Sequence, residues 1–173
     1  MSAPARQVRA IVALSSNLGD RRLILESAVA ALDRVPGVRV AAVSPWFETE
    51  PVGGPAGQPA YLNGALELEC TISARELLEA LLAIEAAHGR VRHGVKNAPR
   101  TLDLDLLFYG DERIHEPGLV VPHPRLEERI FVLEPLARLA PNRHLPGCRR
   151  SVLERLSELS IRRRGIRRGA HAG

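Results

Sequence analysis

The sequence is poor in aromatic residues and cysteines, and it lacks a long apolar run. Two cysteines, Cys70 and Cys148, are too few and too far apart for a disulfide framework or a zinc motif, so we expect both to be buried or incidental. No run approaches the ~20 apolar residues of a membrane span. The short apolar run at residues 10–14 also lacks the length of a signal peptide's apolar region. We therefore expect a cytoplasmic protein with no membrane partner.

The charge of the chain is unevenly distributed. The formal net charge is +4, from 24 Lys and Arg against 20 Asp and Glu. Five of the basic residues lie in the last fourteen positions, where there is no acid: Arg162, Arg163, Arg164, Arg167 and Arg168. Without these five, 19 basic residues face 20 acids, so the body is near neutral. We expect one domain over residues 1–161 and a disordered tail over residues 162–173. Contact of the tail with a phosphate backbone is the alternative, but the near-neutral body argues against nucleic acid as the main partner.

Two aspartates alternate with leucines after a proline-terminated loop. In a strand, residues two apart point to the same face, so Asp103 and Asp105 project together while Leu102, Leu104 and Leu106 point into a core. Two carboxylates on one face repel each other. Mg²⁺ would remove that cost, particularly when phosphates supply its other ligands. The alternative is an ordinary strand with one solvated face.

The order of the expected elements indicates a fold class. Apolar patterns predict strands at residues 7–15, 38–47, 61–70 and 101–109, and helices at 21–35 and 74–87. Strand, helix, strand, strand, helix, strand is the split βαβ pattern of ferredoxin-like α+β sheets. Further on, we expect a short returning strand at 113–115, a loop at 120–124, a helix at 126–139 broken at Pro135, and a last helix at 150–161.

Two long loops each lead into an expected strand. The first precedes the strand that begins at Tyr61, and the second precedes the strand of the two aspartates. Six of the ten residues at 50–59 are Gly or Pro, which predicts a binding loop, a lid or a disordered segment. Residues 88–100 form a second, basic loop that carries Arg90, Arg92, Lys96 and Arg100.

Basic residues precede and follow the two aspartates. Besides the second loop, His123 and Arg129 come after the expected hairpin. A polyphosphate would be attracted by arginines that surround a metal held on two carboxylates, which favours phosphoryl transfer. The alternative for each single arginine is a solvated surface charge.

Two of the few aromatic residues border these loops. Tyr61 begins a strand after the first loop, and Phe131 begins a helix just after Arg129. A flat heteroaromatic substrate could stack between them, with the amide of Asn63 at its edge. Packing of both rings in the core is the alternative.

The segment from Lys96 to Leu107, Lys-Asn-Ala-Pro-Arg-Thr-Leu-Asp-Leu-Asp-Leu-Leu, resembles the signature of the 6-hydroxymethyl-7,8-dihydropterin pyrophosphokinases of folate biosynthesis. The resemblance extends over residues 8–140. Further similar segments follow in the family's order: residues 16–19 (Ser-Asn-Leu-Gly), 61–63 (Tyr-Leu-Asn), 84–85 (Ile-Glu), 89–92 (Gly-Arg-Val-Arg) and 121–123 (Val-Pro-His). Asn97 departs from the family, because many members have Trp there.

The resemblance implies an ATP-dependent diphosphokinase with a ferredoxin-like α/β/α sandwich and a central, mostly antiparallel sheet. It implies transfer of pyrophosphate from ATP to the pterin, which releases AMP. By position, it implies two Mg²⁺ ions on Asp103 and Asp105, which with Arg90 and Arg100 form the catalytic set. ATP contacts would come from Glu85, Arg90, Arg92, Arg100, His123 and Arg129, and pterin contacts from Thr49, Val52, Tyr61, Asn63 and Phe131.

Two other classes remain as alternatives. An RNA-binding module on a similar sheet would need surface aromatics and a basic sheet face. Another Mg²⁺-dependent nucleotidyl or phosphoryl transferase would use a similar site but give different products. We expect a monomer that acts on small molecules.

Overall fold

The computed structural model describes residues 3–51, 54, 56–89, 101–145 and 149–169. Within these ranges, no helix has the length and apolar character needed to cross a membrane. Cys70 is buried, as expected, and burial raises the pKa of its thiol to about 11. Cys148 lies outside the described residues.

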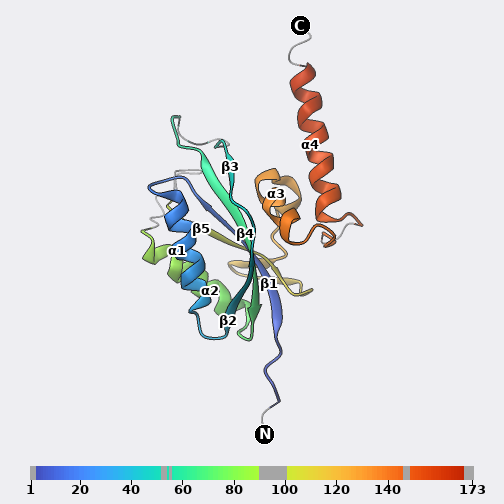
Figure 1. Cartoon of the computed structure of the whole chain (residues 1–173). Helices are drawn as coiled ribbons and strands as arrows, with labels where there is room; N and C mark the ends of the chain where they lie inside the picture. Colours follow the sequence, from blue (N-terminus) through green and yellow to red (C-terminus); the bar gives the residue numbers. More distant parts are fainter. Residues whose placement is uncertain (1–2, 52–53, 55, 90–100, 146–148, 170–173) are drawn as a thin grey trace.

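The centre of the fold is an antiparallel sheet (Figure 1). Its strands are β1 (Val8–Ser16), β2 (Val38–Val43), β3 (Phe47–Thr49), β4 (Tyr61–Cys70) and β5 (Asp103–Tyr109). Their order is β2-β4-β1-β5, and β3 pairs with β4 beside β2. Since β1 and β2 both run antiparallel to β4, they are parallel to each other and joined through a helix. This is the ferredoxin-like arrangement, so the predicted fold class is confirmed.

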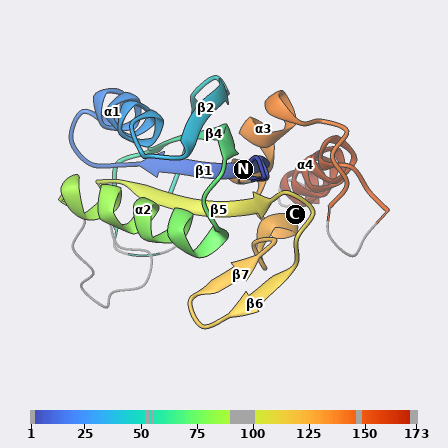
Figure 2. The same cartoon turned by 90° about the horizontal axis from the view of Figure 1, so that it is seen from below.

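Helices cover both faces of the sheet (Figures 1 and 2). On one face lie α1 (Arg21–Asp33) and α2 (Ala74–Ala87); on the other lie α3 (Ile130–Leu139) and α4 (Val152–Gly169). The Asp20 carboxylate caps α1 by accepting the Leu23 N–H, and the predicted capping box of Ser73 and Glu76 opens α2. We call the apolar layer under α1 and α2 the first core, and the layer under α3 and α4 the second core.

The central strand β1 contributes to both cores. Ala10, Val12 and Leu14 pack in the first core, whereas Ile11 and Ala13 pack in the second. A strand that is buried on both faces has a continuous apolar sequence, and this explains why its hydrophobic run does not alternate with polar residues.

The strand β5 contains a bulge that changes which residues face α3. Asp105 pairs with Ala13, but Leu106 pairs with Val12 and Phe108 with Ile11, so Leu107 is the extra residue. Ahead of the bulge, Leu104 and Leu106 enter the first core, as predicted, together with Leu102. Beyond the bulge, Leu107 and Phe108 both lie in the second core.

The C-terminal third differs from the expectation in four respects. The expected returning strand is β6 (Ile114–Glu116), which pairs only with β7 (Leu119–Val121) in a separate two-stranded sheet, so strand replaces part of the expected loop. A short 3-10 helix, η1 (Leu126–Glu128), precedes α3. Pro135 lies inside α3 without ending it: the residue is buried, and the helix continues although the proline removes one backbone hydrogen bond. Finally, α4 continues past residue 161 to Gly169, consistent with the good helix propensity of arginine.

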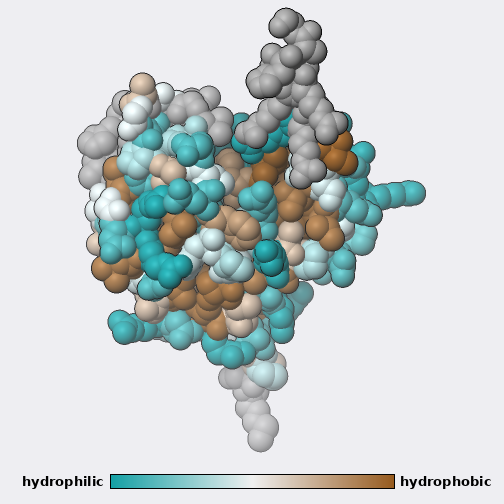
Figure 3. Space-filling view, turned by 45° about the horizontal axis from the view of Figure 1, so that its top comes forward, coloured by the Kyte–Doolittle hydropathy of each residue, from teal (hydrophilic) through white to brown (hydrophobic). Residues whose placement is uncertain are grey.

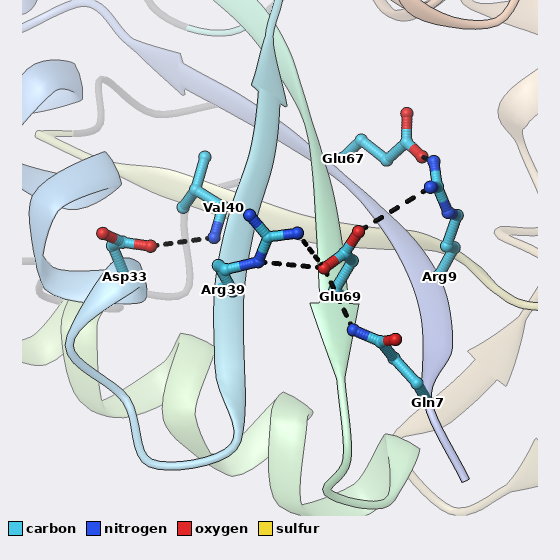
Figure 4. Close-up of polar contacts among 7 residues, drawn as sticks. All are labelled: Gln7, Arg9, Asp33, Arg39, Val40, Glu67 and Glu69. Carbon is cyan, nitrogen blue, oxygen red and sulfur yellow. Dashed lines mark hydrogen bonds and ion pairs between the residues drawn. The ribbon is translucent and has the colours of Figure 1, made fainter.

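At one end of the α3-facing side of the sheet, charged side chains from three neighbouring strands form a network of ion pairs (Figure 4). Arg9 forms ion pairs with Glu67 and Glu69, and Arg39 pairs with Glu69 from the other side. The Gln7 amide donates a hydrogen bond to Glu69 at 3.0 Å. The two arginine side chains are exposed and partly cover the two glutamates, so this end is a solvated, charge-paired face of the sheet.

Candidate active site

The opposite end of the same face holds polar residues that lie in one row across three strands. Ser15 on β1 pairs with Asn63 on β4 and with Asp103 on β5. Two residues earlier on β1, Ala13 pairs with Asp105. Directly paired residues of antiparallel strands point to the same face. Since Ala13 lies in the second core, the side chains of Asn63, Asp103 and Asp105 all lie on the α3-facing side.

The two aspartates are half-buried neighbours on β5. Two positions along a strand separate their backbones by roughly 7 Å. Among the described residues, no group of three or more His, Cys, Asp or Glu side chains could hold a metal ion. A pair of carboxylates fits a hard cation such as Mg²⁺ if other oxygen ligands, such as nucleotide phosphates, complete the coordination.

His123 is attached to β5 through the bulge. Its backbone N–H donates to the carbonyl of Leu107 at 3.0 Å, and its Nδ1 accepts the backbone N–H of Arg125 at 3.2 Å. Because Nδ1 is an acceptor, the neutral ring carries its proton on Nε2. The pKa of His123 is lowered below 6.5, first by burial and then by the positive charges of Arg129 and Arg125, while Asp103 opposes this shift. Arg129 and Asp103 therefore both lie within electrostatic reach of His123.

Arg129 and Phe131 lie where α3 begins. Arg129 is the N-cap residue, and its side chain does not cap the helix. The guanidinium carbon lies 5.7 Å from the centroid of the Phe131 ring, within the range of a cation–π contact. The start of α3 thus presents a cation and an aromatic ring together, near His123.

Asn63 is held in one orientation by β3. It is only 2% exposed, and its Nδ2 donates to the Thr49 hydroxyl at 2.6 Å and to the Phe47 carbonyl at 3.3 Å. Because the amide nitrogen faces β3, its carbonyl oxygen Oδ1 faces the opposite way. Because this amide is already fixed, its Oδ1 can accept a hydrogen bond from a donor on the edge of a ring without a further loss of side-chain entropy.

Tyr61 and Phe131 approach the same region from different elements. Tyr61 pairs with Thr49, which places its side chain on the α3-facing side beside Asn63. Phe131 packs against the second core, and α3 lies over β3 and β4. Both rings are half-buried. Figure 3 brings this end of the molecule forward and shows hydrophobic side chains between hydrophilic ones across the centre of the view.

Some predicted site residues are not brought into this row. Glu85 is 3% exposed and lies on α2, which covers the other face of the sheet. Val52, Arg90, Arg92, Lys96, Asn97 and Arg100 lie outside the described residues, so their roles stay predictions.

Sequence reasoning missed two residues that contact the segment before Tyr61. Asn17 is fully buried, and its Nδ2 donates to the Pro59 carbonyl at 3.2 Å and to the Gln58 side chain at 3.3 Å. Arg21 donates to the Ala60 carbonyl at 2.8 Å. The sequence signal was the segment at residues 16–19, which we noted only for its similarity to the family and to which we assigned no contact.

The family profile and the individual proteins that this sequence resembles all belong to one enzyme family. The profile of the 7,8-dihydro-6-hydroxymethylpterin-pyrophosphokinase (HPPK) family matches residues 11–141. The 2-amino-4-hydroxy-6-hydroxymethyldihydropteridine pyrophosphokinase of Pseudomonas aeruginosa is 45% identical over 141 residues, 82% of this chain and 86% of the relative. The enzyme of the same name from Bacillus subtilis is 46% identical over 130 residues, 75% of this chain and 77% of the relative.

A similar fold occurs in a solved structure. The HPPK-DHPS protein of Plasmodium falciparum, crystallised with pteroate, superposes with a TM-score of 0.74 over 95% of this chain at 11% identity. This chain spans 44% of that protein's length. At this low identity the likeness supports the fold alone.

Proposed function

This chain belongs to the 7,8-dihydro-6-hydroxymethylpterin-pyrophosphokinase family, and we propose that its active site is the row of polar residues at the β4 and β5 end of the sheet. The chain transfers pyrophosphate from ATP to 6-hydroxymethyl-7,8-dihydropterin in folate biosynthesis. The hydroxymethyl oxygen of the pterin attacks the β-phosphorus of ATP and loses its proton. The bond from the β-phosphorus to the α,β-bridging oxygen breaks, and AMP leaves.

The observation that carries the site assignment is the shared pairing of Ser15. It aligns Asp103 on β5 with Asn63 on β4, two strands apart on one face. Two inter-strand spacings are about 10 Å. This separation suits a substrate whose ring is held at Asn63 and whose reacting oxygen reaches phosphates near Asp103.

We assign Asp103 and Asp105 as the carboxylates that hold two Mg²⁺ ions together with ATP. Bound there, Mg²⁺ would neutralise charge on the phosphate oxygens. The half-buried position of both aspartates leaves room for ligands from the nucleotide. The half-buried environment also strengthens their interaction with cations compared with bulk water.

The basic residues at the start of α3 would bind the phosphates. The Arg129 guanidinium offers several N–H donors to phosphate oxygens. The neutral His123 ring offers its Nε2–H as one further donor. By the family resemblance, Arg90, Arg92 and Arg100 would complete this set, and Glu85 would lie near the nucleotide although α2 covers the other face of the sheet. Their contribution would be to position the phosphates and stabilise charge.

The pterin would bind over β3 and β4. Tyr61 and Phe131 would stack on the two sides of the ring, and the fixed amide of Asn63 would hydrogen-bond its edge. Thr49 orients that amide through the 2.6 Å hydrogen bond, and Val52 belongs to the same predicted set. We further infer a monomer that acts in the cytoplasm, which size-exclusion chromatography and fractionation would test.

The test of this function is a product assay. The protein is incubated with ATP, Mg²⁺ and 6-hydroxymethyl-7,8-dihydropterin, and the nucleotide and pterin products are separated by chromatography. We expect AMP and pterin diphosphate in equal amounts. Formation of ADP with a pterin monophosphate would instead assign the chain to a different phosphoryl transferase. Binding of RNA with no turnover would favour the RNA-binding alternative.

A further inference from the structure

The turn between β1 and α1 holds the chain just before Tyr61 from the back of the sheet. Asn17 donates to the Pro59 carbonyl, and the Arg21 guanidinium donates to the next carbonyl, that of Ala60, at 2.8 Å. A second nitrogen of Arg21 pairs with the Glu48 carboxylate at 3.0 Å. One guanidinium therefore contacts both β3 and the segment that leads into β4.

The two contacts of Arg21 lie next to two residues of the proposed pterin site. Glu48 precedes Thr49, Ala60 precedes Tyr61, and Thr49 pairs with Tyr61 across the two strands. Alternate residues of a strand face opposite sides, so Glu48 points to the α1 side while Thr49 points to the α3 side. Arg21 thus lies behind the sheet and links the Glu48 side chain, next to Thr49, to the backbone carbonyl of Ala60, next to Tyr61.

The strength of these contacts is unequal. The Glu48 side chain is 61% exposed, and an ion pair of that kind contributes little to stability. The Arg21 side chain is 29% exposed, and its donation to Ala60 is a charge-assisted hydrogen bond in a part-buried position. The carbonyl contact is therefore the stronger of the two, and it fixes the end of the Gly- and Pro-rich segment rather than the fold as a whole.

The position of Arg21 in its helix supports a tertiary role. It is the first residue of α1, where the helix dipole disfavours a positive charge, and the first turn contains no acid. Arg22 occupies the same unfavourable turn but is exposed. Arg22 is consequently a matched control for the effect of charge at this helix end.

We propose that Arg21 is a positioning residue for the pterin: it sets the register and spacing of Thr49 and Tyr61 by holding Ala60 and Glu48 together. This inference rests on the proposed pterin site. Arg21 contacts Ala60 and Glu48 on the α1 side of the sheet, whereas the described residues proposed to bind metal and the ATP phosphates lie on the α3 side, so its effect should be confined to pterin affinity.

The experiment compares steady-state kinetics of the wild-type chain with R21A, R21K and R22A. We expect R21A to raise the KM for the pterin roughly tenfold, the size expected from losing one charge-assisted hydrogen bond, with kcat and the KM for ATP within about twofold. R21K retains a charge that reaches only one of the two partners, so its pterin KM should be intermediate. R22A should match wild type.

Hydrogen exchange of the backbone at residues 58–62 gives a readout that does not depend on turnover. In R21A these amides should exchange faster, while those of β1 should not change. An unchanged pterin KM in R21A would overturn the inference, as would equal losses of kcat, both KM values and melting temperature. Failure of the proposed function would look different, because the wild-type chain itself would then give no AMP.

Discussion

Asp103 and Asn63 lie opposite the same residue of β1, since Ser15 pairs with Asp103 on one side and with Asn63 on the other. The side chains of the two residues consequently share one face of the sheet, although 40 positions of sequence separate them. The proposed metal site on β5 and the proposed pterin site on β4 are therefore both attached to β1 by backbone pairing. The two sites could move relative to each other only if β1 lost its pairing with one of these strands.

Replacement of either aspartate should abolish most activity without unfolding the protein. In Asp103→Asn and Asp105→Asn, kcat/KM should fall by about 10²–10³-fold, the size typical of a lost electrostatic contact to the reacting groups. The melting temperature should stay near wild type, because removing one of two neighbouring like charges relieves repulsion. Asp111→Asn is the control, since that side chain is exposed in the turn after β5. Retained activity of both aspartate variants at ordinary Mg²⁺ would refute the metal assignment.

Thr49→Val should reduce both stability and pterin affinity. It removes the hydroxyl that accepts from Asn63 and leaves a buried N–H without this partner, which costs about 1–3 kcal/mol of unfolding free energy. The KM for the pterin should rise, and the KM for ATP should not change. Thr49→Ser keeps the hydroxyl and serves as the control. Denaturant unfolding and kinetics measure the two effects, and equal behaviour of the two variants would contradict the role given to the hydroxyl.

The lowered pKa of His123 predicts a loss of stability at mildly acidic pH. Below about 6.5, the unfolded chain takes up a proton at His123 that the folded chain does not yet bind. Folding stability from this group is therefore fully present above pH 7 and decreases as pH falls through 6.5 toward the lower folded pKa. His123→Gln should flatten the dependence of melting temperature on pH in this range. An NMR titration of His123 with a midpoint at or above 6.5 would contradict this prediction.

The sequence predicts some regions of this structure better than others, and the reasons are physical. The bounds of β4 (Tyr61–Cys70) and of α2 (Ala74–Ala87) were predicted to within a residue, because strand alternation and a capping box are local signals. The common face of Asp103 and Asp105 likewise follows from the period of a strand. The bulge at Leu107 was not predictable, because apolar residues continue through it and both faces of β5 are buried there. The contacts of Asn17 and Arg21 were also missed, since they join positions about 40 apart that only the fold brings together.

Gly64 should not tolerate a side chain, because β4 passes close behind Trp46. A Cβ placed on Gly64 would overlap the Trp46 ring. Gly64→Ala should lower the unfolding free energy by about 1–3 kcal/mol, the usual effect of overpacking. The double variant Gly64→Ala with Trp46→Leu should recover part of that loss, since the overlapping ring is gone. A double-mutant cycle by urea denaturation measures this coupling, and strictly additive effects would contradict the steric explanation.

The basic C-terminal segment should be dispensable for catalysis. Deletion of residues 162–173 should leave kcat and both KM values within about twofold, because the packed part of α4 lies at Val152, Leu156 and Leu159. The segment is helical as far as Gly169, so circular dichroism should report a small loss of helix. A large loss of activity would mean that the segment reaches the active site.

The central claim is that Asp103 and Asp105 hold metal ions together with ATP. It is tested most directly by counting bound Mn²⁺, as a Mg²⁺ substitute, by electron paramagnetic resonance with α,β-methylene ATP, whose α,β bridge resists cleavage. Two Mn²⁺ ions per wild-type chain in the presence of the analogue, and at most one in Asp103→Asn with Asp105→Asn, is the result we predict. An unchanged stoichiometry of two in the double variant would contradict the claim.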